Sequence, residues 1–219
     1  MKNLIILGGS GIGMIAANIA EELGYYNILG FLNDIIPTGE KIGKYKTYKV
    51  IGTTNAIEYY LQDENCYFFI AYVGLKKEKE TFEKINKLQI PTNRYATLIH
   101  PTAIIPKGYC SIGHGVLIGP NAQLSPDTTV EDNCILLGSS FLGHDSTMKK
   151  FAHLATNSVV GANVIVGRGV HIGSNSTIRE KTNIGDFSLI GSGAVVLENV
   201  ENNSIVVGNP AKKISKIPK

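Results

Sequence analysis

The sequence predicts a protein of two parts, an α/β domain over residues 1–92 and a parallel β-helix over residues 93–219. The first part is predicted by apolar strands that alternate with helical patterns. The second is predicted by aliphatic residues that recur at every sixth position. With 219 residues, of which 43% are hydrophobic and 18% charged, the chain can bury a substantial core, and a disordered chain is excluded.

The N-terminal part has the pattern of a nucleotide-binding unit. Residues 4–7 form an apolar run that predicts a buried strand, and a glycine-rich turn over 8–13 follows it. Apolar residues at helical spacing then predict a helix that ends at Gly24. The remaining elements alternate in the same way, with strands over 28–32 and 67–73 and helices over 54–61 and 76–88. This βαβαβ order predicts a parallel sheet.

The glycine-rich turn places backbone N–H groups at a helix N-terminus, which suits a phosphate group. Asp34, at the end of the second strand, is placed to accept a hydrogen bond from a ribose or a base. About 90 residues supply only one half of a dinucleotide fold, so a single nucleotide moiety, such as that of an activated sugar, fits better than NAD. A tight turn without a ligand is the alternative, because Met14 breaks the strict G-x-G-x-x-G spacing.

The C-terminal part contains an unbroken repeat. Each sixth residue from Ile112 to Val196 is Ile, Leu, Val or Met, at fifteen positions in all. A period of six suits a short strand followed by a tight corner, and three such hexads close one triangular coil. Fifteen hexads therefore predict about five coils stacked at roughly 4.8 Å. Glycine follows eight of these aliphatic residues, where a Cβ would obstruct the turn. Cys110 and Cys134 occupy the small inward slot two positions before an aliphatic, so we interpret both as core residues.

Charge and cysteine usage exclude several classes of partner. With 21 basic and 18 acidic residues, the net charge of +3 is too small to indicate nucleic acid. Three widely spaced cysteines do not form a disulfide framework and fit a reducing cytosol. The N-terminal apolar run breaks after four residues, whereas a membrane span needs about 20. We therefore expect a cytoplasmic protein with no membrane span.

Several motifs together resemble those of the NeuD/PglD-like sugar acyltransferases. Besides the glycine-rich turn and the hexapeptide repeat, they are Leu32–Asp34, the bridging Leu98–Ala103 and the closing Val207–Lys212. The resemblance covers nearly the whole chain, and it implies a Rossmann-like half domain followed by a left-handed parallel β-helix. It implies transfer of acetyl from acetyl-CoA to the 4-amino group of a UDP-, GDP- or dTDP-linked sugar for surface glycan biosynthesis. It also implies a homotrimer with sites between adjacent β-helices and no metal.

In this family the general base is a His followed by an acid, which here are His144 and Asp145. A neutral imidazole near pH 7 suits removal of a proton from an ammonium group. Asp145 can raise the basicity of His144 and stabilise the imidazolium that forms. His144 lies two residues beyond the inward-facing Leu142, so we expect it at a corner or outer face. A solvated or capping role is the alternative for a lone histidine.

The resemblance places His153 in contact with acetyl-CoA. It lies nine residues from His144, half of one coil, so the two are expected on different sides of one chain and could meet only across a subunit boundary. His171 follows His153 by 18 residues and should stack above it as a surface residue lining the CoA groove. His100 and His114 are interpreted as structural.

Other residues are assigned to ligands by the same resemblance. The turn that supplies an N–H group to the oxyanion aligns with Gly161 and Ala162, and a second CoA-contacting turn contains Ser192. For Lys212, contact with the CoA phosphates and a solvated basic tail stay open as alternatives. The expected sugar-nucleotide residues are Gly9, Ser10, Gly11, Ile12, Asn33, Asp34 and Gly74.

Two positions depart from the family pattern. Many relatives have an Asn about seven residues before the catalytic His, where this chain has Leu137 followed by Gly138. The segment around Gly74 also lacks the expected Gly-Asn-type loop. We expect both departures to influence which base or sugar is accepted.

Three other functions compete with sugar N-acetylation. O-acetylation of a sialic acid is the nearest, because a histidine base could serve a hydroxyl as well as an amine. A zinc carbonic anhydrase also uses this kind of helix, but it needs three histidines around one metal, and no third histidine completes a cluster here. A non-catalytic scaffold that binds NAD or a sugar nucleotide is the third.

Overall fold

The computed structural model describes residues 1–9, 11–72 and 78–217. In the N-terminal part, a five-stranded sheet has the order β3-β4-β2-β1-β5, in which only β3 is antiparallel to its neighbour. Its elements are β1 (Lys2–Leu7), α1 (Ile12–Leu23), β2 (Tyr26–Leu32), β3 (Lys41–Ile42), β4 (Tyr48–Gly52), α2 (Ile57–Leu61), β5 (Cys66–Ile70) and α3 (Glu78–Asn86). Short 3₁₀ turns cover Thr54–Ala56 and Thr92–Arg94.

The central strand β1 is buried on both of its faces. Leu4 and Ile6 pack into the cluster that contains the apolar side of α1, and Ile5 and Leu7 pack into the cluster that contains Ile57 of α2. This two-sided burial explains why the strand reads as a continuous apolar run rather than an alternating one. The α1 helix ends as expected, because Gly24 adopts the left-handed conformation with φ of 71°.

Two elements of this part differ from the expectation. The sequence did not predict the β3–β4 hairpin, in which β4 extends the parallel sheet beside β2. These strands contain only two and five residues, so their periodicity is weak. Strand β5 ends at Ile70, three residues before the expected end. The helix expected over 76–88 is present as α3, whose described residues are Glu78–Asn86.

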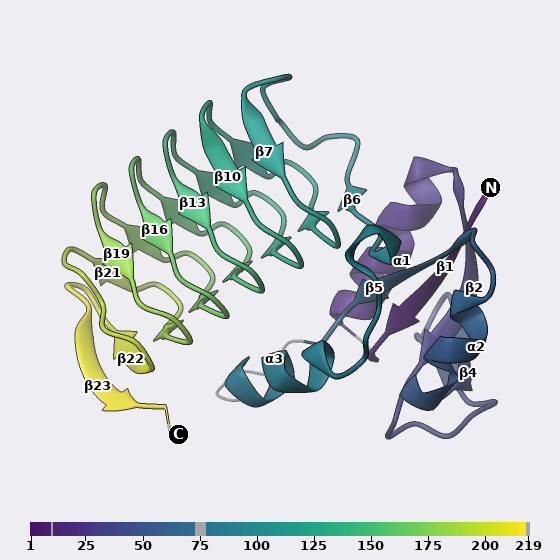
Figure 1. The fold of residues 1–219 in the computed structure, drawn as a ribbon. Helices are drawn as coiled ribbons and strands as arrows, with labels where there is room; N and C mark the ends of the chain where they lie inside the picture. The colour runs from purple at the N-terminus through teal and green to yellow at the C-terminus, as the bar shows by residue number, and fades with distance from the viewer. Residues whose placement is uncertain (10, 73–77, 218–219) are drawn as a thin grey trace.

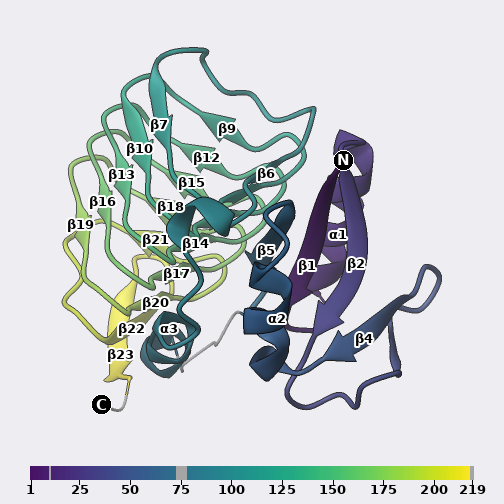
Figure 2. The ribbon, with the colours of Figure 1, turned by 45° about the vertical axis from the view of Figure 1, so that its right-hand side comes forward.

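The C-terminal part is a parallel β-helix with three faces, shown in Figure 1 and, turned by 45°, in Figure 2. Face 1 contains β7 (Cys110–Ile112), β10 (Thr128–Val130), β13 (Thr147–Met148), β16 (Ile165–Val166) and β19 (Asn183–Ile184). Face 2 contains β6 (Leu98–Ile99), β8 (Leu117–Ile118), β11 (Ile135–Leu136), β14 (His153–Leu154), β17 (His171–Ile172), β20 (Leu189–Ile190), β22 (Ser204–Val207) and the antiparallel β23 (Lys212–Lys216). Face 3 contains β9 (Gln123–Leu124), β12 (Phe141–Leu142), β15 (Val159–Val160), β18 (Thr177–Ile178) and β21 (Val195–Val196).

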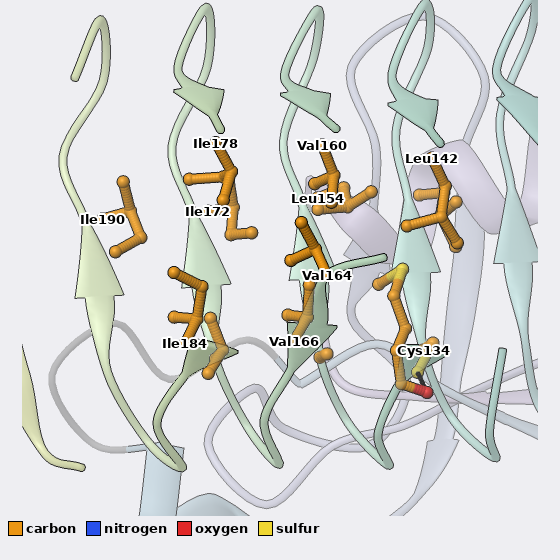
Figure 3. Close-up of a cluster of buried hydrophobic side chains, with 14 of the residues drawn as sticks. Cys134, Leu142, Leu154, Val160, Val164, Val166, Ile172, Ile178, Ile184 and Ile190 are labelled. Atoms are coloured by element: carbon orange, nitrogen blue, oxygen red, sulfur yellow. Dashed lines mark hydrogen bonds between the residues drawn. The ribbon is translucent and has the colours of Figure 1, made fainter. Parts of the chain in front are cut away.

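The repeat produces the predicted inner column. Residues 18 positions apart pair in neighbouring coils, such as Leu136 with Leu154. The fourteen aliphatic positions from Ile118 to Val196 are each at most 2% exposed, and Figure 3 shows several of them stacked inside the coils. Cys134 lies in this core, where burial raises the pKa of its thiol, and Cys110 packs against the core from its edge. The prediction is confirmed for Cys134, whereas Cys110 is partly buried at the edge of the core.

The corners follow a rule that the sequence analysis missed. The third residue after each aliphatic from Ile112 to Ile190 has left-handed backbone, which Asn, Asp and Gly adopt most readily. These residues are Gly115, Asn121, Asp127, Asn133, Ser139, Asp145, Phe151, Asn157, Asn163, Gly169, Asn175, Lys181, Phe187 and Gly193. The glycine directly after the aliphatic has a different task. A Cβ on Gly143 would lie 2.6 Å from the carbonyl carbon of Gly161, so these glycines allow neighbouring coils to stack.

The N-terminal domain packs against face 2 of the β-helix. Its core cluster continues into Leu98, Leu117 and Ile135, which belong to three successive strands of that face. At the edge between faces 1 and 2, the ring of Phe82 from α3 contacts the ring of Phe151, with centroids 5.1 Å apart. The faces of the β-helix are therefore unequal, since one is covered by the chain's own N-terminal domain.

Candidate active site

The His144–Asp145 pair lies at a corner and points outward, as the sequence predicted. The Nδ1 atom of His144 is 2.6 Å from Oδ2 of Asp145, and the two side chains are 60% and 51% exposed. A carboxylate at Nδ1 favours the tautomer with its proton on that nitrogen. The Nε2 atom of His144 then carries the lone pair, as a general base requires.

Neighbouring coils fix the backbone beneath this pair. The carbonyl oxygen of His144 accepts a hydrogen bond from the N–H of Asn163, and the N–H of Asp145 donates to the carbonyl oxygen of Pro126. Asp145 has left-handed backbone, with φ of 58°, because it occupies the third position of its hexad. The repeat therefore dictates the relative placement of the two side chains.

His144 lies at the edge of the β-helix farthest from the N-terminal domain. It follows β12 of face 3 and precedes β13 of face 1, so it belongs to the edge between those faces. In a triangular coil this edge is opposite face 2, against which the chain's own N-terminal domain packs. A ligand held by that domain and the His144 of the same chain are thus on opposite sides of the helix.

Gly161 and Ala162 lie one coil beyond His144 on the same edge. The hypothetical Cβ of Gly143 would meet both the Gly161 carbonyl and the Ala162 nitrogen, at 2.6 and 2.7 Å. The N–H of Gly161 already donates to the carbonyl oxygen of Ile178. Among the backbone hydrogen bonds of the described residues, the N–H of Ala162 donates none. Of the two expected oxyanion donors, only the Ala162 amide is available.

The structure brings His153 and His171 together on face 2, as their spacing predicted. Their Nδ1 atoms are 3.1 Å apart, and their rings are nearly perpendicular. His153 is only 7% exposed, whereas His171 is partly exposed. Burial lowers the pKa of His153 to about 3 and that of His171 to about 4, and the proximity of His171 adds to the effect on His153. Both imidazoles are neutral near pH 7.

The glycine-rich turn lies at the C-terminal end of β1, in the order the sequence predicted. Gly11 is exposed and has left-handed backbone with φ of 70°, and Ile12 begins α1. Gly9 lies beside Asn33, whose amide nitrogen would be 3.3 Å from a Cβ on that glycine. Two expected ligand residues, Ser10 and Gly74, lie outside the described residues.

Asn33 is a structural tie within this turn. It is buried, its Nδ2 donates to the carbonyl oxygen of Gly8 at 2.7 Å, and its Oδ1 accepts from the N–H groups of Ile35 and Ile36, each at 2.8 Å. The bond to Gly8 therefore joins the ends of β1 and β2, and the other two bonds close the turn that follows β2. This geometry indicates that Asn33 shapes the turn from within.

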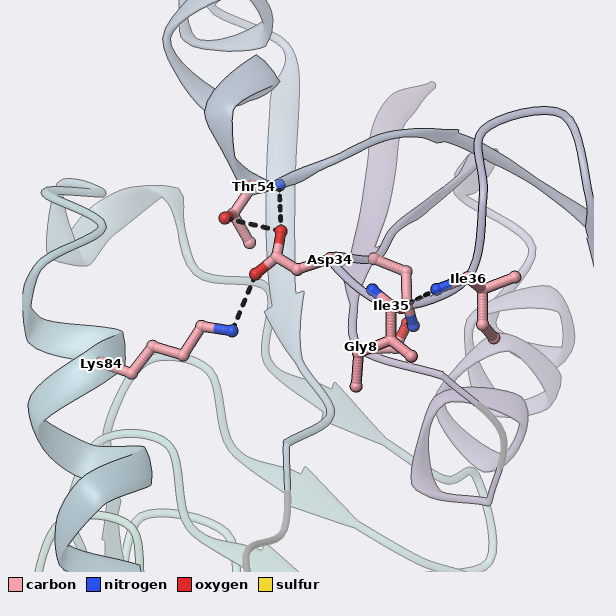
Figure 4. A network of polar contacts seen from close by, with 7 residues as sticks. Gly8, Asp34, Ile35, Ile36, Thr54 and Lys84 are labelled. Carbon is pink, nitrogen blue, oxygen red and sulfur yellow. Dashed lines mark hydrogen bonds and ion pairs between the residues drawn. The ribbon is translucent and has the colours of Figure 1, made fainter.

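Asp34 already has partners on both carboxylate oxygens. Its Oδ1 accepts from the N–H and the hydroxyl of Thr54, both at 2.8 Å, and its Oδ2 accepts from Nζ of Lys84 at 2.7 Å (Figure 4). Burial pulls the pKa of Asp34 upward, but these hydrogen bonds outweigh it and hold the pKa below its ordinary value. Sequence reasoning missed Thr54 and Lys84, which lie 20 and 50 residues away.

The remaining expected CoA contacts lie elsewhere on the β-helix. Ser192 is exposed at the edge between faces 2 and 3, directly after β20. Lys212 is exposed on β23, which extends face 2 at its C-terminal end. Within one chain, neither is on the edge that carries His144 and Ala162.

Leu137 and Gly138, where the chain departs from the family pattern, line a groove of about 460 Å³. The groove lies between the start of α1 and the edge between faces 2 and 3, with Met14, Ile15, Ile19 and Pro120 as its other apolar residues. It begins next to the glycine-rich turn, because Met14 belongs to the first turn of α1. The departure thus affects a surface close to the expected nucleotide position.

Two general findings concern the described residues only. Within residues 1–9, 11–72 and 78–217, no three His, Cys, Asp or Glu side chains are grouped so that they could hold a metal ion. None of the helices described is both long enough and apolar enough to cross a membrane.

Comparisons with protein families match both parts of the chain. Residues 3–85 match the PglD N-terminal domain, and residues 109–144 match the bacterial transferase hexapeptide family (six repeats). No curated protein matches the chain in a comparison of sequences.

Solved structures match nearly the full length. The acetyltransferase domain of PglB from Neisseria gonorrhoeae is 26% identical, with a TM-score of 0.84, over 98% of this chain and 100% of that one. The same domain has been solved with acetyl coenzyme A. A perosamine N-acetyltransferase variant from Caulobacter crescentus, solved with CoA and GDP-perosamine, is 18% identical, with a TM-score of 0.85, over 99% and 98%. WeeI from Acinetobacter baumannii is 20% identical, with a TM-score of 0.64, over 98% and 100%. The predicted fold and the resemblance to NeuD/PglD-like acyltransferases are confirmed.

Proposed function

We propose that this chain, an acyltransferase of the NeuD/PglD-like type, transfers acetyl from acetyl-CoA to the amino group of a nucleotide-linked amino sugar. The observation that carries the proposal is the His144–Asp145 pair, with Nδ1 bound to the carboxylate and the imidazole exposed at an edge of the β-helix. The PglB domain solved with acetyl coenzyme A supports acetyl-CoA as the donor. The perosamine N-acetyltransferase variant solved with CoA and GDP-perosamine supports a sugar nucleotide as the acceptor.

In the proposed reaction, the lone pair of the neutral amino nitrogen attacks the thioester carbonyl carbon, and Nε2 of His144 removes a proton from that nitrogen as the C–N bond forms. Asp145 stabilises the imidazolium that results. The N–H of Ala162, one coil away and without another acceptor among the described backbone groups, donates to the oxyanion. When the C–S bond breaks, the imidazolium returns its proton to the CoA thiolate, and an amide is left on the sugar.

The sugar nucleotide is held by the N-terminal domain in this proposal. The N–H groups around Gly9, Gly11 and Ile12 lie where β1 passes into α1, and they bind the diphosphate at the helix N-terminus. Asn33 acts by shaping this turn, and Asp34 contacts the nucleoside directly or through Thr54. Ser10 and Gly74 complete the expected set.

The active form is a homotrimer in this proposal. His144 lies opposite the face that carries its own N-terminal domain, so the sugar nucleotide must meet the His144 of another copy. A cyclic trimer gives each N-terminal domain the same relation to a neighbouring edge. Acetyl-CoA then lies between β-helices, where the Ala162 edge of one copy and the Ser192 edge of another can both contribute.

The proposal is tested by release of the CoA thiol from acetyl-CoA. The acceptors are UDP-, GDP- and dTDP-linked 4-amino sugars, with a sialic acid as the hydroxyl acceptor. We expect thiol release with at least one amino sugar, and substitution His144→Ala should lower kcat by about 10²–10⁴-fold while CoA still binds. The matched control is His114→Ala, which removes an exposed histidine on another edge. Thiol release with the sialic acid alone would favour the O-acetyltransferase alternative. If none of the acceptors caused thiol release, both functions would be contradicted.

A further inference from the structure

Two stacked histidines on face 2 form a unit distinct from the His144 edge. His153 of β14 and His171 of β17 are in register on adjacent parallel strands. Their Nδ1 atoms are 3.1 Å apart, a hydrogen-bond distance, and their ring centroids are 4.6 Å apart at 87°. Each ring thus uses one nitrogen for the other ring and keeps its Nε2 for a different partner.

These rings line a cavity of about 40 Å³ between the N-terminal domain and face 2. Tyr72 and Phe82 line it from the N-terminal domain, and Phe151 lines it from the β-helix. The Nε2 atom of His153 is buried and makes no hydrogen bond with any described residue, and the same holds for the Tyr72 hydroxyl. Buried polar groups normally have a partner, so this wall of the cavity is built to receive a hydrogen-bonding group.

The tautomer of one ring determines the tautomer of the other. Each neutral imidazole carries one proton, on either Nδ1 or Nε2. The Nδ1···Nδ1 hydrogen bond needs a proton on only one of the two Nδ1 atoms. The ring that donates through Nδ1 therefore has a bare Nε2, and the ring that accepts has a protonated Nε2. Whenever one Nε2 is a donor, the other is an acceptor.

Charge does not disturb this relation near neutral pH. Burial lowers the pKa of both rings far below 7, to about 3 for His153 and about 4 for His171. Among the described residues that line the cavity, none is a carboxylate that could hold either ring in its charged form. The described lining also includes Thr81 and Asn133, which are polar and uncharged.

We propose that His153 and His171 form a tautomer-coupled pair that recognises a ligand group offering one hydrogen-bond acceptor and one donor, as a secondary amide does. A phosphate oxygen offers acceptors only and can satisfy just one of the two Nε2 atoms. The inference rests on the proposed function, since two ligands of that reaction contain secondary amides: the pantetheine arm of CoA and the acetamido group of the product. It assigns a ligand contact to His171 that goes beyond lining a surface.

The direct test is two-bond ¹H–¹⁵N NMR of the histidine rings in the full chain at pH 7.5, which separates protonated from bare ring nitrogens. We expect opposite tautomers, with a single protonated Nδ1 between His153 and His171. Two Nε2-protonated rings, or a positively charged ring, would overturn the coupling. This readout needs no catalysis, so a failure of the proposed function would be seen separately, as intact coupling without thiol release.

The ligand is identified by adding three probes to the same sample. Changes on adding CoA would assign the amide to the pantetheine arm, and changes only on adding UDP-N-acetylglucosamine would assign it to the acetamido product. Inorganic sulfate, which is fully ionised at this pH and offers acceptors only, should leave the ring signals unchanged. A response to sulfate, or to none of the probes, would refute recognition of an amide.

Two variants separate recognition from packing. His171→Asn keeps a polar amide near the Nδ1 position but removes Nε2, so we expect the probe that responds to bind about 10-fold more weakly, with the fold retained. Tyr72→Phe removes only the cavity hydroxyl and should preserve the opposite tautomers. His114→Asn is the matched control on an exposed histidine and should change neither binding nor the ring signals. Unchanged binding in His171→Asn would refute the contact assigned to His171.

Discussion

Lys84 and Asp34 are joined by an ion pair of 2.7 Å between Nζ and Oδ2, although 50 residues separate them in the chain. Lys84 belongs to α3, the helix that reaches the β-helix through Phe82 and Phe151. Asp34 follows β2 at the expected nucleotide site. The pair therefore connects the contact between the two parts of the chain with the end of the sheet at which a nucleotide is expected.

The two partners of this pair should differ in importance for stability. Lys84→Ala should change the free energy of unfolding by less than about 1 kcal/mol, because the pair is partly exposed and screened by solvent. Asp34→Ala should cost about 1–2 kcal/mol more than that, because the N–H and hydroxyl of Thr54 lose their acceptor at the start of the following 3₁₀ turn. Urea unfolding of both variants measures this difference, and equal losses would contradict it.

The left-handed corner at Asp145 gives a second prediction. Asp145→Asn should fold normally, since Asn tolerates this backbone and its Oδ1 can still accept from Nδ1 of His144. It should lose activity by about 10-fold, because a neutral amide stabilises the imidazolium less well than a carboxylate. Asp145→Ala should lose more activity and also some stability. Thiol-release kinetics and thermal unfolding separate these effects, and full activity in Asp145→Ala would exclude Asp145 as a helper of His144.

Stacking of the coils predicts the effect of adding one methyl group. In Gly167→Ala, the new Cβ would lie 2.7 Å from the backbone nitrogen of Asp186, which the next coil holds in place. We expect a loss of about 2–3 kcal/mol in the free energy of unfolding. In Gly108→Ala, the new Cβ would meet nothing within 4 Å, and only the left-handed backbone (φ of 81°) is strained. That control should cost about 1 kcal/mol in denaturant unfolding.

The buried histidines predict a loss of stability in acid. The pKa values of His153 and His171 in the folded chain, about 3 and about 4, lie below the ordinary 6.5, so the unfolded chain binds more protons in between. The two neutral histidines make their full contribution to the free energy of unfolding above pH 6.5. This contribution is lost as the pH falls towards 4 and then 3. The slope is at most about 1.4 kcal/mol per pH unit for each histidine. Urea unfolding between pH 4 and 7 should show a shallower slope in His171→Gln than in the unmodified chain.

The position of His144 predicts that inactive variants restore each other. One variant is His144→Ala, and the other is Gly11→Glu, which places a negative charge in the exposed turn expected to bind phosphates. Each alone should be inactive, but random mixing into trimers should recover about one quarter of the activity per site. Recovery requires that the nucleotide and the histidine come from different copies. Two active-site halves within one chain would give no recovery after mixing, as measured by thiol release.

The six-residue period was enough to predict the β-helix, its register and the direction of its side chains. Because a residue and its neighbour 18 positions later must stack, the period alone places Leu142 inside, His144 at a corner and His171 above His153. The same local logic identified β1, the glycine-rich turn and the end of α1 at Gly24. These features depend on short-range periodicity and backbone conformation, which a sequence records directly.

The way in which the two parts meet could not be predicted from the sequence and became visible in the folded chain. Three features depend on where the N-terminal domain packs. His153 is enclosed beside Tyr72, Lys84 forms an ion pair with Asp34, and His144 lies opposite the covered face. Such contacts join residues tens of positions apart, and no periodic pattern encodes which face of a three-sided helix an attached domain will cover. The physical reason is that burial of apolar surface is not directional, so the docked arrangement follows from the fit of two whole surfaces.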